Sequence, residues 1–316
     1  MQYRLAKGEP LGPGLRRIAG EQLTAAVVDL ESCRPDPQEA VHDARKRLKK
    51  VRAILRLARG QLDPTFYETE NSRLRNIGRD LAPFRDAHVR HAGFLGLVDR
   101  HRDLLAHDAF RDVEVILRGD RRACLAGFAG SQERQAAVAA LREESSGPEG
   151  WPLEAAGFDA LRPGLERIYR QGARRMRKAF KDGAPERFHD WRKSVKYLWY
   201  HMRILQAAWP DVLRPTTAAL HDLSDVLGEA HDLSELARAV RDFDPPFANG
   251  AAGELLAELV AGRCTALHVQ SWRLGERLYA EEPQAFVDRV ESYWRAWRRG
   301  DPGTLIALPE PPGTTG

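Results

Sequence analysis

The feature that most constrains the fold of this 316-residue chain is an internal repeat. Three pairs of segments match in the same order, at offsets of 150, 147 and 146 residues. They are residues 13–18 with 163–168, residues 41–49 with 188–196, and residues 81–86 with 227–232. Matches that keep their order along a chain indicate a duplication. We therefore expect two similar halves that sit about a pseudo-two-fold axis.

Both halves have the pattern of helices. Ala, Leu, Arg and Glu recur at three- and four-residue spacing, whereas alternating β-branched segments are hard to find. Residues 143–152 break this pattern with Ser, Gly and Pro, which is typical of a linker. We predict an all-α fold of two four-helix bundles about a basic central groove. The predicted boundaries are 1–148 for the first bundle, 149–157 for the linker, 158–300 for the second bundle and 301–316 for a flexible tail.

Composition excludes several classes of protein. A hydrophobic content of 43% excludes wholesale disorder, and three scattered cysteines exclude a disulfide framework or a cysteine-based zinc site. No stretch of about 18 apolar residues is present, and the first residues lack the apolar core of a secretory signal. We therefore expect a cytoplasmic protein. The net charge of +4 indicates little by itself, because the field at a site depends on how its charges are arranged.

The basic residues are concentrated on one segment of the first half. His42, Arg45, Lys49, Arg52 and Arg56 step by three and four residues, so they form one stripe on a helix. Residues 43–59 contain eight basic residues and one acidic residue, a net charge of 8 − 1 = +7. Like charges on neighbouring turns destabilise a helix by a few tenths of a kcal/mol each. An anionic ligand would offset that repulsion.

The second half repeats the stripe with His189, Arg192, Lys196 and Arg203, and Lys193 lies alongside. If the two helices face each other across the axis, their cationic rows line one groove. Further cations on neighbouring helices are expected to reach this groove: Arg75, Arg79, Arg85, Arg170, Arg174 and His231.

Rows of Arg and Lys about 5 Å apart suit a repeating polyanion. Arginine offers forked donors to phosphate oxygens, and lysine offers a mobile point charge. Recognition of bases would require aromatic side chains between the cations, and the first stripe has none. A phosphate polymer without bases therefore fits better than a nucleic acid. Cations around His42 and His189 are expected to lower the pKa of both histidines, so binding of a polyanion should take up protons.

The segments 42–49 and 189–196, both His-x-x-Arg-Lys-x-x-Lys, resemble the CHAD family, the conserved histidine α-helical domain. Segments 81–86 and 227–232 are similar to that family too. The resemblance covers about residues 8–300 and implies a stand-alone member that binds inorganic polyphosphate between two four-helix bundles. It also implies association with polyphosphate granules, and neither enzymatic activity nor a cofactor. The residues that match the family's basic motif are His42, Arg45, Lys46, Lys49, Arg52, His189, Arg192, Lys193 and Lys196.

Two positions depart from the family pattern. Trp199 stands where arginine is commoner, and His231 replaces the usual arginine before Asp232. These departures leave two points open: how much positive charge lies on one side of the groove, and which contact residue 231 makes.

Other functions remain open at this stage. Five His-Asp dipeptides, at positions 42, 107, 189, 221 and 231, suggest a metal-dependent phosphohydrolase, although a metal site favours negative surroundings. A helical nucleic-acid-binding protein and a scaffold that uses the aromatic residues of segment 293–297 are further alternatives. We predict no catalytic residue, no metal and no membrane partner, and make no prediction of oligomeric state.

Overall fold

The computed structural model describes residues 2–33, 36–102, 108–128, 130–154, 157–241 and 250–299. Within these ranges the regular elements are all helical and no strand occurs, which confirms the all-α prediction. The α-helices of the first half are α1 (Leu11–Ser32), α2 (Pro37–Leu57), α3 (Pro64–Asp80), α4 (Ala82–Arg100), α6 (Asp108–Phe128) and α7 (Gln132–Ser145). Those of the second half are α8 (Arg162–Asp182), α9 (Pro185–Leu205), α10 (Pro210–Arg241), α12 (Ala251–Leu278) and α13 (Pro283–Arg298). Short 3₁₀ turns are η1 (Arg59–Gln61), η2 (Gly147–Gly150), η3 (Phe158–Ala160) and η4 (Gln206–Ala208).

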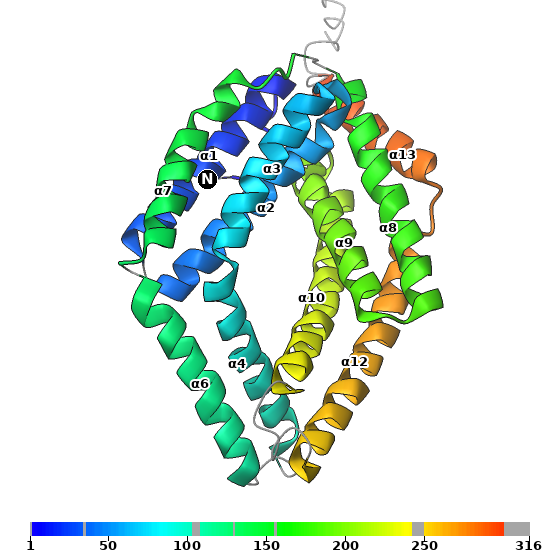
Figure 1. Ribbon diagram of the computed structural model, residues 1–316. Coiled ribbons are helices and arrows are strands. Elements are labelled where there is room, and N and C mark those ends of the chain that lie inside the picture. The colour runs from blue at the N-terminus through cyan, green and yellow to red at the C-terminus, as the bar shows by residue number, and fades with distance from the viewer. Residues whose placement is uncertain are drawn as a thin grey trace, which may run out of the picture.

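The helices of the two halves lie side by side (Figure 1). In the first half α1 packs on α2, and α4 packs on α6; in the second half α8 packs on α9, and α10 packs on α12. The halves meet where α2 contacts α9 and where α4 contacts α10. Two of the three pairs of matching segments, 41–49 with 188–196 and 81–86 with 227–232, therefore lie on helices that meet in space.

Local sequence signals explain where α2 and α9 begin and which face they bury. The carboxylate of Asp36 accepts hydrogen bonds from the first backbone N–H groups of α2, and proline follows it at the first helical position. α9 also begins with a proline, Pro185, but its N-cap residue is Ala184, which makes no side-chain capping hydrogen bond. Apolar residues recur at three- and four-residue spacing on both helices and form a buried seam on each, with exposures of at most 1% for Ala44, Leu48, Val51 and Leu55 of α2 and for Trp191, Val195, Leu198, Met202 and Leu205 of α9. Burial of these seams fixes the rotation of both helices and so the direction of their basic stripes.

Buried apolar residues form two clusters. The larger cluster occupies the end of the molecule that holds α1, α2, α8 and α9. The smaller cluster packs α4 and α6 against α10 and α12 at the other end. Each cluster draws residues from both halves of the sequence, so side chains from both halves stabilise each end.

α2 and α9 cross at close range inside the larger cluster. The buried His201 of α9 lies with Nε2 2.9 Å from the backbone oxygen of Ala53 on α2. Nearby, a Cβ atom at Gly164 of α8 would lie 2.0 Å from the backbone oxygen of Leu57, so glycine allows the helix backbones to touch. The two halves are held together tightly at this end of α2.

The segment predicted as a linker, 149–157, packs against the larger cluster where it is described. Trp151 and Leu153 are 2% and 1% exposed. The predicted tail, 301–316, lies outside the described residues. None of the described helices carries an apolar stretch long enough to cross a membrane.

Candidate functional site

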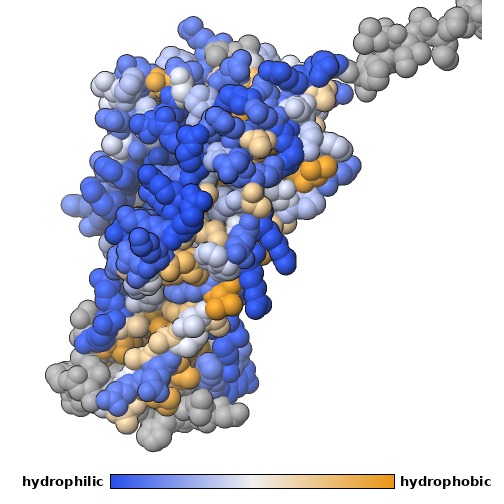
Figure 2. All heavy atoms as spheres, turned by 90° about the vertical axis from the view of Figure 1, so that its right-hand side faces the viewer, coloured by the Kyte–Doolittle hydropathy of each residue, from blue (hydrophilic) through white to orange (hydrophobic). Residues whose placement is uncertain are grey.

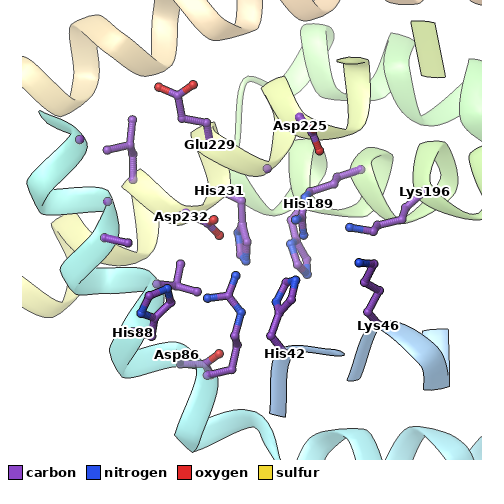
Figure 3. A pocket seen from close by; sticks show the side chains of 18 of the residues that line it. His42, Lys46, Asp86, His88, His189, Lys196, Asp225, Glu229, His231 and Asp232 are labelled. Carbon is purple, nitrogen blue, oxygen red and sulfur yellow. The ribbon is translucent and has the colours of Figure 1, made fainter. Parts of the chain in front are cut away.

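A cavity of about 760 Å³ lies between α2 and α4 on one side and α9 and α10 on the other. From α2 it is lined by His42, Arg45, Lys46 and Lys49, and from α9 by His189, Arg192 and Lys196. Figure 3 shows the imidazoles of His42, His189 and His231 pointing toward one another, with Lys46 and Lys196 beside them. The structure therefore brings the first three residues of each basic stripe to one cavity. From the neighbouring helices it adds Arg85 and His231, as predicted.

The charge on the cavity wall is positive overall. The lining contains eight Arg and Lys residues and four carboxylates, a net charge of 8 − 4 = +4 with neutral histidines. Some charges are matched: Glu229 is 2.7 Å from Arg263, and Asp225 is 2.7 Å from His221. At the edge, Lys46 lies 3.5 Å from Asp43.

The central cations have carboxylates nearby but form no direct ion pair with them in the described part of the chain. In the part of the chain that the structure describes, Lys49, Arg85, Arg192 and Lys196 form no ion pair. Within the described residues, two buried nitrogen atoms at the cavity have no hydrogen-bond partner: Nε of Arg192 and Nδ1 of His189. Unpaired charge at a partly enclosed site is costly in the free protein. An anion in the cavity would supply the missing partners.

Burial and mutual repulsion lower the pKa of the two facing lysines. Loss of solvation is the main cause for Lys49, and Lys196 and Arg45 add repulsion, which brings the pKa of Lys49 to about 7. The pKa of Lys196 falls to about 8, through loss of solvation and then through Arg192. Both ammonium groups are therefore poised to change their protonation when a ligand alters the local field.

The histidines are held neutral. The pKa of His42 is lowered to about 4, first by loss of solvation and then by Arg85. The pKa of His189 is lowered to about 3 by loss of solvation and then by His231, whose ring centre is 4.0 Å away. The direction agrees with the expectation from sequence. The leading cause is desolvation, and the neighbouring cations come second.

Other elements shape the cavity around these groups. The guanidinium of Arg45 donates to the backbone oxygen of Gly78 at 2.6 Å, which fixes its direction. A Cβ atom at Gly228 of α10 would lie 3.2 Å from Nη2 of Arg192. Glycine at that position leaves room for the guanidinium beside α10.

Several lining residues were missed by the sequence reasoning. They are His88, Arg100, His221 and Arg263, the carboxylates Asp86, Asp225, Glu229 and Asp232, and the aromatic residue Tyr200. Trp199, which the sequence marks as a departure from the family pattern at the groove, lines the cavity as well. A signal for some of them exists: residues 221, 225, 228, 229 and 232 recur at helical spacing on one face of α10. Loss of solvation raises the pKa of Asp232, which the cavity surrounds with Arg192, His231 and Arg85.

The more distal members of the predicted α2 stripe do not line this cavity. Arg52 donates to Oδ1 of Asn71 at 3.1 Å, and Arg56 donates to the hydroxyl of Tyr67 at 2.8 Å, both on α3. Arg56 also stacks over the ring of Tyr197, 4.4 Å from its centre. These two side chains are engaged with protein partners.

The remaining predicted residues also do not line the cavity. Arg75 and Arg79 are exposed on α3. Lys193 is 3.0 Å from Asp190, and Arg203 lies over the rings of Tyr3 and Trp199. On α8, Arg170 pairs with Glu166, and Arg174 lines a smaller pocket.

The His-Asp dipeptides do not assemble into a metal site in the described ranges. Within them, no three His, Cys, Asp or Glu side chains are grouped as metal ligands would be. His107 lies outside the described residues.

A comparison with protein families matches residues 17–241 to the CHAD domain. The matched range includes α2, α4, α9 and α10, which are the helices that line most of the cavity. No curated protein matches the chain.

Proposed function

Because the chain belongs to the CHAD domain family, whose domain is associated with polyphosphate, we propose that it binds inorganic polyphosphate in the cavity between α2, α4, α9 and α10. The observation that carries the proposal is the set of central cations without ion pairs, Lys49, Arg85, Arg192 and Lys196. They come from three helices, α2 and α4 of the first half and α9 of the second, so a ligand that touches all of them bridges both halves of the chain.

The chemistry of the cavity favours phosphate oxygens as the ligand. Forked guanidinium groups can bind two oxygens of one phosphate, and ammonium groups can follow a flexible chain. Neutral histidines add donors that gain charge when a polyanion raises their pKa. The proposed role is binding, without turnover of the ligand, and it would bring the protein to polyphosphate granules.

The proposal includes an internal duplication with a pseudo-two-fold axis. It is supported by the packing order, because α1–α2 and α4–α6 of the first half correspond to α8–α9 and α10–α12 of the second half. The equivalent helices α2 and α9 contact each other, as do α4 and α10. Such an axis would pass through the cavity and explain why both basic stripes face it.

Calorimetric titration with polyphosphate at several salt concentrations tests the proposal. Binding to four or more phosphates by counterion release predicts that log K falls with log[salt] with a slope of about −3. Competition with single-stranded RNA of equal charge distinguishes a base-free ligand from a nucleic acid. Affinity that is independent of salt, or RNA that displaces polyphosphate at equal charge, would contradict the proposal.

A further inference from the structure

A second cationic surface lies outside the cavity, on α8. Residues 162–182 contain eight basic and two acidic residues, a net charge of 8 − 2 = +6. The corresponding helix of the first half, α1, contains two basic and three acidic residues, a net charge of 2 − 3 = −1. Duplication therefore does not explain the charge of α8.

The basic residues of α8 occupy one exposed face. At 100° per residue, six of them fall within an arc of about 100°, opposite the buried residues Leu165, Ile168 and Met176. The face spans about 21 Å along the helix axis. Its residues, which we call the α8 face, are Arg167, Arg170, Arg174, Arg177, Lys178 and Lys181, and all are exposed.

Few of these charges are matched by the protein. Arg170 pairs with Glu166, but the other five residues of the α8 face form no ion pair within the described ranges. Figure 2 faces the side of the molecule where α8 lies and shows mostly hydrophilic side chains over its upper part. Repulsion between like charges on neighbouring turns makes this face unfavourable without an anion.

The α8 face lies beside the first turns of α9, the helix that carries His189. A pocket of about 290 Å³ between α8 and the start of α9 is lined by Arg174, Arg175, Lys178, Arg187 and Asp190. Asp190 directly follows His189, which lines the cavity. The small pocket and the cavity are therefore lined by neighbouring residues of α9.

The side chains that line the small pocket are held in position by local contacts. The guanidinium of Arg175 donates to the backbone oxygen of Asp190 at 3.1 Å and to Oγ of Ser194 at 2.8 Å. Arg187 lies 2.6 Å from Asp182 at the end of α8. These bonds tie the last turns of α8 to the first turns of α9, so the α8 face is held in a fixed position beside a helix that lines the cavity.

We propose that the α8 face and the adjoining pocket bind the part of a long polyphosphate chain that leaves the cavity. This inference rests on the proposed function and adds to it a dependence on chain length. A base-free polyanion fits because the α8 face contains no aromatic side chain for bases to stack on, and Tyr169 of the same helix is fully buried. Two linked sites on one chain raise affinity through effective concentration.

The test compares short and long ligands on one variant. Arg174→Gln/Arg177→Gln/Lys178→Gln removes three exposed charges from the α8 face while keeping good helix formers. For long-chain polyphosphate we expect affinity to fall by about tenfold or more, and the salt slope to become shallower by about 2. For tripolyphosphate, which the cavity alone can hold, we expect a change of less than about twofold.

A matched control has the same change in net charge. Arg122→Gln/Arg214→Gln/Arg241→Gln removes three exposed cations from α6 and α10, away from both surfaces. We expect it to bind both ligands like the wild-type protein. Circular dichroism should show equal helicity for both variants.

Three outcomes would overturn the inference: unchanged long-chain affinity in the α8 variant, equal loss for both ligands, or loss of single-stranded RNA binding alone. The cavity is tested separately with Lys49→Glu/Lys196→Glu. If that variant keeps long-chain binding while the α8 variant loses it, the proposed cavity function fails and the α8 surface stands. If the wild-type protein binds neither ligand, both proposals fail.

Discussion

Each of the paired helices α2 and α9 carries one stripe of residues that passes through two regions with different surroundings. Before the helices cross, the stripes point into the cavity, with Lys49 on α2 and Lys196 on α9 as their last cations there. At the crossing, marked by the contact of His201 with Ala53, the stripes meet protein. Beyond it, Arg56 is bound to Tyr67 and Tyr197. Helical periodicity therefore gives the face on which a residue lies, but the packing of the partner helix decides how far that face stays open.

Reversing charge on the cavity side of the crossing should have the largest effect. Lys49→Glu/Lys196→Glu replaces two of the proposed contacts to phosphate with two repulsions. Because a hydrogen bond to a charged group contributes about 1.5–3 kcal/mol, we expect polyphosphate affinity to fall more than about a hundredfold. Calorimetric titration measures this loss.

The matched control is Arg122→Glu/Arg214→Glu, which makes the same change in net charge on exposed helix positions outside the cavity. A similar loss of affinity in both variants would show that the overall field of the protein, and not the cavity, holds the ligand.

The second prediction concerns the uptake of protons by Lys49, on the cavity side of the crossing, when the ligand binds. With a pKa of about 7, Lys49 is mostly neutral at pH 8 in the free protein. A bound polyanion raises that pKa, so binding takes up a proton, and affinity should fall by up to about tenfold per pH unit between pH 7 and 9. Titration in buffers of different ionisation enthalpy counts the protons.

The control is Lys49→Arg, because arginine keeps its charge throughout this range. It should retain binding and take up fewer protons, with the remainder assigned to Lys196. Equal proton uptake in the wild-type protein and in this variant would place the titrating group elsewhere.

The third effect concerns the free protein. The lowered pKa of Lys49 means that the folded state disfavours its charge, so the unfolded chain binds more protons between about pH 7 and 10. The contribution of Lys49 to stability is therefore most unfavourable below pH 7, and stability should rise as pH increases through that window. Lys49→Met should raise Tm at neutral pH by about 2–4 °C for each kcal/mol gained, and the gain should shrink toward pH 10.

Thermal unfolding monitored by circular dichroism, without ligand, measures this effect. The same substitution should weaken polyphosphate binding, which separates stability from function at one position. A lower Tm in Lys49→Met would mean that the ammonium group has a favourable partner in the free protein.

Much of the fold could be predicted from the sequence. The apolar seams of α2 and α9 follow directly from helical spacing, and their burial confirms that pattern. The distribution of the core could not be predicted in this way. Because α4 packs on α10 and α2 packs on α9, each buried cluster combines residues from both halves, and such contacts depend on pairing between distant segments.

Only those site residues that share one face of a single helix could be predicted from the sequence. The stripe residues His42, Arg45 and Lys49 could be predicted because they share one helix face. The carboxylates of α10 were missed because their position opposite Arg192 depends on how α10 packs against α9. The protein partners of Arg52 were missed for the same reason, since Asn71 lies on another helix.

The smallest effect on binding is expected beyond the crossing. Arg56→Gln removes the donor to Tyr67 and the guanidinium over Tyr197, but it leaves the cavity lining intact. We expect polyphosphate affinity to change by less than about twofold, whereas Tm should fall because a hydrogen bond and a cation–π contact are each worth about 1 kcal/mol. Lys46→Gln is the comparison, because Lys46 lies on the same helix and lines the cavity. It should weaken binding and leave Tm nearly unchanged. If Arg56→Gln weakened binding more than Lys46→Gln, the ligand would have to reach past the crossing, and the boundary drawn by His201 and Ala53 would be wrong.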